Sequence, residues 1–157
     1  MKRSVRKILF AAAGLILILV LAAAVLLIVL SVREYRPKER ETVKIDKNTG
    51  KKISPGQEIS VLTWNTGYGA LSETEDFFMD GGEKVRPDNE ELITENIEAM
   101  KKVIKDSGSQ VVFLQEVDQN SKRSYYINEV DAFSDGWNGS TGYARNFLCD
   151  YIPYPLP

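Results

Sequence analysis

Two polar residues, each at the end of a strand-like run, carry the clearest chemistry in this chain. Asn65 follows an apolar run that includes Val61, and Glu116 follows the run 111–114. In open α/β sheets, ligands bind at the carboxyl ends of strands. An amide carbonyl and a carboxylate are hard oxygen donors, the kind that Mg²⁺ prefers. The sequence therefore predicts that Asn65 and Glu116 bind a metal, with Mg²⁺ or Mn²⁺ as the cofactor.

Ordinary structural roles compete with this interpretation. Asn is common in the turn after a strand, so Asn65 can serve the fold alone. Glu116 can form a salt bridge, although a carboxylate beside a buried strand must be paired, hydrated or bound to metal. Asp118 is either a second acid or the cap of a following helix. The pattern assigns no catalytic residue.

The surrounding segments predict the elements that position these residues. We expect strands at 58–64 and 110–115, the second buried on both faces. A helix is expected from Pro87 to about Asp106, ended by Ser107-Gly108. Its apolar face would hold Leu92, Ile93, Ile97, Met100, Val103 and Ile104. Strand, helix and strand at this spacing predict an α/β layer in which a helix covers a sheet.

The remaining soluble segments are predicted less regularly. A short helix is expected over 124–132 and a third strand over 143–148. The run 151–157 holds three prolines and is predicted to be neither helix nor central strand, because proline donates no backbone hydrogen bond.

A long apolar segment precedes this domain. Residues 8–30 contain no charged side chain, and as a helix they would span about 34 Å, enough to cross a hydrocarbon core of roughly 30 Å. A cleaved signal peptide is the alternative, but the run is long and no Ala-x-Ala pattern follows it. We expect a short basic tail at 1–7, a transmembrane helix at 8–30 contacting the lipid bilayer, and a polar linker at 31–57.

The basic N-terminal tail favours a single-pass membrane protein with its C-terminal domain outside the cytoplasm, although basic residues also follow the span. The part beyond residue 30 is acidic overall, so nucleic acid is possible as a partner but not favoured. One cysteine excludes an internal disulfide and a cysteine-based zinc site. The pair Lys122-Arg123 is predicted to be solvated surface.

Two motifs in order resemble the endonuclease/exonuclease/phosphatase superfamily. The motifs are Val61–Gly69 and Phe113–Asp118, and the segments Asp76–Gly82 and Ser121–Tyr125 resemble its membrane-associated bacterial members. The resemblance covers about residues 58–157. It implies a four-layer α/β sandwich of two packed mixed β-sheets flanked by helices, and Mg²⁺-dependent hydrolysis of phosphodiesters or phosphomonoesters. By the same resemblance, Asn65 and Glu116 would hold the metal.

The chain also departs from that family. It contains no histidine, and the family's later Asp-x-Asn and Asp-His elements have no counterpart in it. We therefore expect residues 58–157 to represent the N-terminal half of such a domain, truncated and without the family's activity on its own. The alternatives are a membrane-anchored binding or interaction module without catalysis and, third, a small membrane protein with a largely disordered soluble part.

Overall fold

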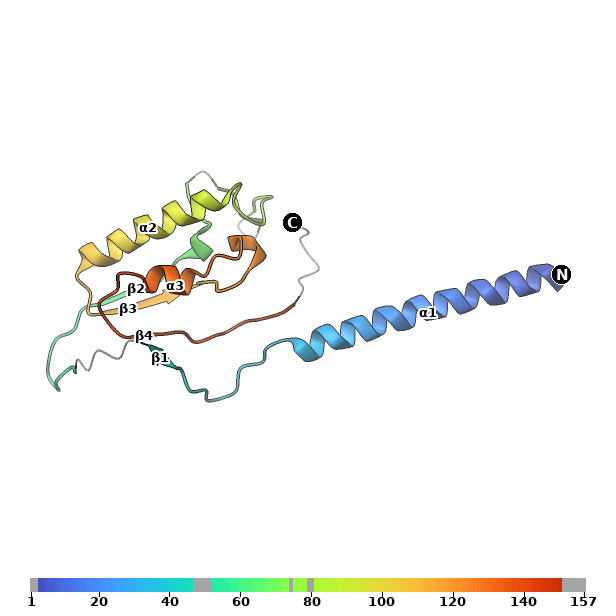
Figure 1. Ribbon diagram of the computed structural model, residues 1–157, viewed down its shortest axis with the longest axis horizontal. Helices are drawn as coiled ribbons and strands as arrows, with labels where there is room; N and C mark the ends of the chain where they lie inside the picture. The colour runs from blue at the N-terminus through green and yellow to red at the C-terminus, as the bar shows by residue number, and fades with distance from the viewer. Residues whose placement is uncertain (1–2, 47–51, 74, 79–80, 151–157) are drawn as a thin grey trace. The chain divides into compact units, whose positions relative to one another are not determined.

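The computed structural model describes residues 3–46, 52–73, 75–78 and 81–150 (Figure 1). The chain divides into two compact units, each described by itself below. The first contains the N-terminal residues as far as Thr42 together with residues 144–150, and the second contains residues 43–143. The candidate metal ligands belong to the second unit.

The first unit is built on one long helix. Helix α1, Arg3–Arg33, has 31 residues, and none of them is buried. It is long and apolar enough to cross a membrane. The core helix of a soluble protein would be covered by other elements, whereas these leucines and isoleucines are exposed along the whole helix. The predicted apolar helix over 8–30 is confirmed, and association with a lipid bilayer fits it.

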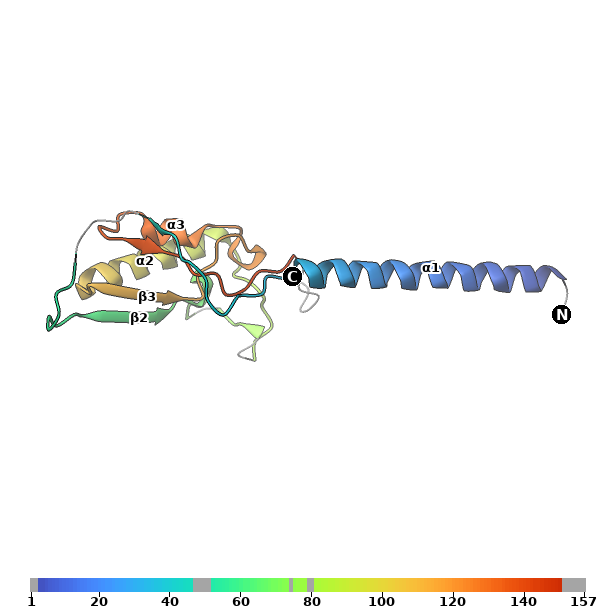
Figure 2. The same ribbon diagram turned by 90° about the horizontal axis from the view of Figure 1, so that it is seen from below.

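The second unit contains a parallel pair of strands. Strands β2, Val61–Asn65, and β3, Val111–Gln115, pair from Val61 with Val111 to Asn65 with Gln115. Helix α2, Glu90–Ser107, lies over one face of this pair (Figure 1 and Figure 2). The other face is open: Val61 is 51% and Phe113 is 57% exposed. The expectation that β3 is buried on both faces is therefore wrong for the described residues.

Helix α2, Glu90–Ser107, follows its sequence signals closely. The Asn89 side chain caps it by accepting a hydrogen bond from the Leu92 amide at 2.9 Å. Gly108 ends it in the left-handed conformation, at φ 62°. Three isoleucines of the predicted apolar face are buried and form most of the core: Ile93, Ile97 and Ile104. The predicted helix is confirmed, although it begins three residues later than Pro87.

Other elements differ from the prediction. A 3₁₀ turn at Lys122–Ser124 and helix α3, Glu129–Ser134, replace the single helix expected at 124–132. No strand forms at 143–148; instead β4, Thr141–Gly142, pairs antiparallel with β1, Ile45–Asp46. Part of the segment predicted as a linker thus pairs within the second unit.

These elements make a mixed α/β structure with an N-terminal apolar helix, as predicted. The described residues form two two-stranded sheets. The four-layer sandwich stays a prediction. The expectation for residues 151–157 lies outside the described residues.

Close packing against Ile93 of α2 depends on Gly69, in the 3₁₀ turn η1, Gly67–Gly69. Its φ is +62°, and an added Cβ would lie 2.9 Å from Ile93 Cγ2. We expect Gly69→Ala to lower the free energy of unfolding by about 2–4 kcal/mol, because overpacking adds to left-handed strain. Urea unfolding of the full chain in detergent, followed by tryptophan fluorescence, measures the change.

Gly108→Ala is the matched control for Gly69→Ala. Gly108 has the same φ of +62°, but nothing lies within 4 Å of an added Cβ. The Gly108→Ala variant therefore measures only the cost of placing an alanine in the left-handed conformation, expected at about 1 kcal/mol. Equal losses at Gly69 and Gly108 would contradict the packing argument.

Candidate functional site

The two predicted metal ligands lie at the same edge of the parallel strand pair. Asn65 is the last residue of β2 and is paired with Gln115, the last residue of β3. Glu116 comes directly after Gln115, so both candidate ligands stand at the carboxyl ends of adjacent parallel strands. This is the arrangement that the sequence predicts, and it is the edge at which α/β sheets bind ligands.

Asn65 also plays the local role that was the competing interpretation. Its Oδ1 accepts a hydrogen bond from the Gly67 amide at 3.0 Å, which fixes the turn after β2. An amide oxygen has two lone pairs, so one acceptor position remains for a second partner. The turn role and a metal-binding role are therefore compatible at this residue.

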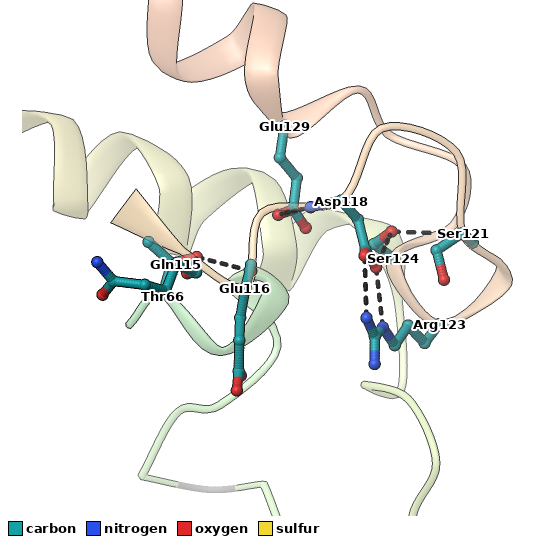
Figure 3. A network of polar contacts seen from close by, with 8 residues as sticks. All are labelled: Thr66, Gln115, Glu116, Asp118, Ser121, Arg123, Ser124 and Glu129. Carbon is teal, nitrogen blue, oxygen red and sulfur yellow. Dashed lines mark hydrogen bonds and ion pairs between the residues drawn. The ribbon is translucent and has the colours of Figure 1, made fainter. Parts of the chain in front are cut away.

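Glu116 has an exposed side chain and an unusual backbone. Its φ is 56°, in the left-handed region that non-glycine residues rarely adopt. Within the described ranges its carboxylate makes no hydrogen bond and no ion pair, so the salt bridge considered from the sequence is not formed there. Figure 3 shows the side chain pointing away from Glu129. The residue is exposed, so its carboxylate is accessible to a ligand from solvent.

Thr66 ties the loops after the two strands together. Its Oγ1 lies 3.0 Å from the Gln115 carbonyl and 2.9 Å from the Glu116 carbonyl, and its amide donates to the Gln115 carbonyl at 2.9 Å. The Tyr68 amide donates to the Glu116 carbonyl at 2.9 Å. Thr66 is buried, so these bonds are shielded from water. They hold the backbone of Glu116 in its strained conformation.

Asp118 is neither a free acid nor a helix cap. Its carboxylate accepts two hydrogen bonds from Arg123, Nε to Oδ2 at 2.9 Å and Nη2 to Oδ1 at 3.0 Å. The Ser124 hydroxyl donates to the same carboxylate at 3.1 Å, as Figure 3 shows. Only 32% of the Arg123 side chain and 13% of the Asp118 side chain are exposed. The prediction that Lys122-Arg123 is plain solvated surface is wrong for Arg123.

Arg123 also covers the ring of Tyr68. Its guanidinium carbon lies 3.1 Å from the ring centroid, a stacked cation–π contact. Burial raises the pKa of the Tyr68 hydroxyl, and the positive charge of Arg123 opposes that rise. The phenol is therefore neutral at physiological pH. Arg123 connects the loop after β3 with the turn η1 after β2.

Glu129 is a buried acid that no motif in the sequence analysis identified. It is 0% exposed, and its Oε2 accepts a hydrogen bond from the Asp118 amide at 2.9 Å. Its Oε1 is buried with no hydrogen-bond partner among the described residues. Burial raises the pKa of Glu129 to about 7, and the hydrogen bond from Asp118 opposes the rise. An isolated carboxylate oxygen of this kind favours the protonated form.

Backbone strain is concentrated beside this site. Among the described residues, positive φ at non-glycine positions occurs at Tyr68, Glu116, Tyr125 and Tyr126. Tyr68 lies in the turn η1 after β2, Glu116 follows β3 directly, and the two others follow the turn that holds Arg123. Such conformations cost of order 1–3 kcal/mol each and cluster at functional sites, where the surrounding structure holds them. Their position marks the carboxyl edge of the strand pair as a candidate site.

The donor set at this edge suits a weakly held hard cation. No group of three or more acidic, histidine or cysteine side chains suited to a metal ion occurs in the part of the chain that the structure describes. Asn65 and Glu116 therefore offer two oxygen donors. Mg²⁺ often binds through one or two carboxylates and keeps several of its waters. The two residues fit such an ion, and metal binding stays a prediction.

Comparisons with protein-family models, with curated proteins and with solved structures find no match for this chain. The resemblance to the endonuclease/exonuclease/phosphatase superfamily therefore rests on the motifs Val61–Gly69 and Phe113–Asp118 and on the segments Asp76–Gly82 and Ser121–Tyr125.

Proposed function

We propose that this chain is a membrane-anchored protein whose soluble unit holds Mg²⁺ or Mn²⁺ with Asn65 and Glu116 for phosphoester hydrolysis. One observation carries the proposal. Asn65 ends one of two adjacent parallel strands and Glu116, whose carboxylate has no partner among the described residues, follows the other, on a backbone that Thr66 holds under strain. A bound divalent ion would neutralise phosphate charge and stabilise the charge that develops in hydrolysis.

The chain's own residues limit the mechanism. It has no histidine, so no imidazole from this chain can move a proton. Asp118 is occupied by Arg123 and Ser124, which leaves Glu116 as the exposed carboxylate at this edge. Phosphodiesters and phosphomonoesters are both within the proposal. The acidic balance of the soluble part favours small phosphoesters over nucleic acid.

Glu116→Gln should weaken Mn²⁺ binding at least about tenfold, because the only charged donor of the pair is lost. Asn65→Ala should weaken it by a smaller factor. Titration of the full chain in detergent, followed by the electron paramagnetic resonance signal of free Mn²⁺, measures the affinity. Glu91→Gln is the matched control, since Glu91 is an exposed carboxylate on α2. Equal affinity in the Glu116→Gln variant and the unmodified chain would rule the site out.

A membrane-anchored binding module without catalysis is the second candidate. The observation that favours it is the small donor set: the described residues contain no cluster of three metal-binding side chains, and the chain has no histidine. Hydrolysis of bis(p-nitrophenyl) phosphate with Mg²⁺ separates the two candidates. Because no turnover is expected of this chain on its own, turnover that Glu116→Gln abolishes would support the hydrolase and contradict that expectation. Mn²⁺ binding that depends on Glu116 supports the hydrolase site, and Mn²⁺ binding that is absent or independent of Glu116 supports the module.

A further inference from the structure

A second segment of the chain lies at the end of the apolar helix. The Tyr35 amide donates to the Leu148 carbonyl at 2.8 Å, and Arg33 Nε lies 2.8 Å from Asp150 Oδ2. The positive charge of Arg145 also acts on the Tyr35 hydroxyl, opposing the rise in its pKa that the hydrogen bond to Glu41 causes. Residues 144–150 and the end of α1 belong to one compact unit. The segment runs antiparallel to residues 33–35. Asp150 therefore contacts the last residue of the helix, and Leu148 contacts Tyr35, which lies beyond it.

The depth of this contact follows from helix geometry. The apolar run of α1 ends at Leu30, and Arg33 lies about 4.5 Å further along the helix axis. The polar layer on each side of a bilayer is roughly 5–7 Å thick. When α1 crosses a bilayer, Arg33 therefore lies in the headgroup layer, and Asp150, bound to it, lies there as well.

The segment presents apolar side chains at this depth. Phe147 is 58% and Leu148 is 42% exposed, and both lie within the stretch that contacts the helix end. Aromatic and apolar side chains are stable at the boundary between headgroups and acyl chains. The ion pair with Arg33 offsets the charge of Asp150, which lowers the free energy needed to hold an acid at that level.

We propose that residues 144–150 are a second membrane-contacting segment, which inserts Phe147 and Leu148 at the bilayer surface beside the end of α1. The occupant of this apolar surface is lipid, because the segment is hydrogen-bonded and ion-paired to the end of a helix that is long and apolar enough to cross a membrane. The segment ties the chain that leaves β4 to the bilayer, so the soluble unit is held at both of its ends. The proposal is independent of the metal site.

The single cysteine of the chain allows a direct test. Cys149 lies between Leu148 and Asp150 and is partly exposed, so it can carry a fluorescent label in the full chain. In phosphatidylcholine nanodiscs, we expect a nitroxide on the lipid headgroup to quench the label several-fold more than a nitroxide near the end of the acyl chain. The double variant Phe147→Ser/Leu148→Ser should lose most of that quenching.

Two controls make each outcome decisive. Phe113→Ser removes a phenylalanine of nearly equal exposure, 57%, from β3, and it should leave the quenching unchanged. Ser31→Cys with Cys149→Ser places the label on α1 itself and should be quenched by headgroup nitroxide. Quenching at Ser31→Cys without quenching at Cys149, or equal quenching in the double variant, overturns the proposal. No quenching at either position overturns its premise that α1 lies in the bilayer.

Discussion

Arg123→Ala is expected to lower the free energy of unfolding by about 3 kcal/mol, because it leaves the largely buried Asp118 carboxylate without its charged partner. The same substitution removes the guanidinium from the Tyr68 ring. Arg123 then no longer connects the loop after β3 with the turn after β2, and the hydrogen bonds between these two loops must hold them together without it. Urea unfolding of the full chain in detergent, with tryptophan fluorescence as the signal, measures the loss.

Three further variants show whether the ion pair is responsible. Arg123→Lys should recover only part of the loss, since an ammonium cannot make the bidentate contact or stack on a ring. Glu98→Ala breaks the exposed pair with Lys101 and should change stability by at most about 0.5 kcal/mol. In a cycle with Asp118→Ala, the coupling between the two residues should exceed about 1 kcal/mol. A coupling near zero contradicts this account.

Glu129→Gln is expected to stabilise the protein at alkaline pH and to leave it nearly unchanged in acid. The pKa of Glu129 is raised from 4.5 to about 7, so the folded protein keeps a proton that the unfolded chain has lost between these values. Stability therefore falls as pH rises through this interval and is lowest above it. The shift corresponds to a loss on the order of 3 kcal/mol, which a neutral amide avoids.

Unfolding measured at about pH 5 and about pH 8 tests the sign of this effect. The gain from Glu129→Gln over the unmodified chain should be small at the lower pH and near its full value at the higher. The charged neighbours, Asp118 and Arg123, shift the pKa in opposite directions, so burial decides it. Glu95→Gln, on an exposed position of α2, should show no such pH dependence. A gain that is equal at both pH values would show that Glu129 does not titrate there.

The sequence was sufficient to predict α2 and the strand pair because their signals are local. The three-to-four apolar spacing and Gly108 of the helix, and the apolar, β-branched runs of the strands, each act over a few residues. The position of Asn65 and Glu116 at one edge followed from a single further step, since the carboxyl ends of parallel strands meet. Which side chains an α/β layer brings to that edge can therefore be predicted before the structure is known.

The rest depended on contacts between distant segments. Arg123 in Lys122-Arg123 resembles any exposed basic pair, and only the fold places it against Asp118 and Tyr68. Glu129, the first residue of α3, is buried against the Asp118 amide and beside Gly69, which no pattern within the helix indicates. Residues 143–148 have strand-like composition, but no strand forms there. Strand propensity predicts poorly where the available pairing partners decide whether a strand forms.

Parallel pairing also determines the order in which the soluble unit can assemble during synthesis. Val61 and its partner Val111 are separated along the chain by α2 and its flanking loops, so β2 leaves the ribosome well before β3. At about 5–20 residues per second, β2 waits several seconds with both of its edges unpaired. Through that interval its hydrogen-bonding groups are open to any neighbouring strand. The rate of translation between β2 and β3 is therefore a factor in the yield of folded protein.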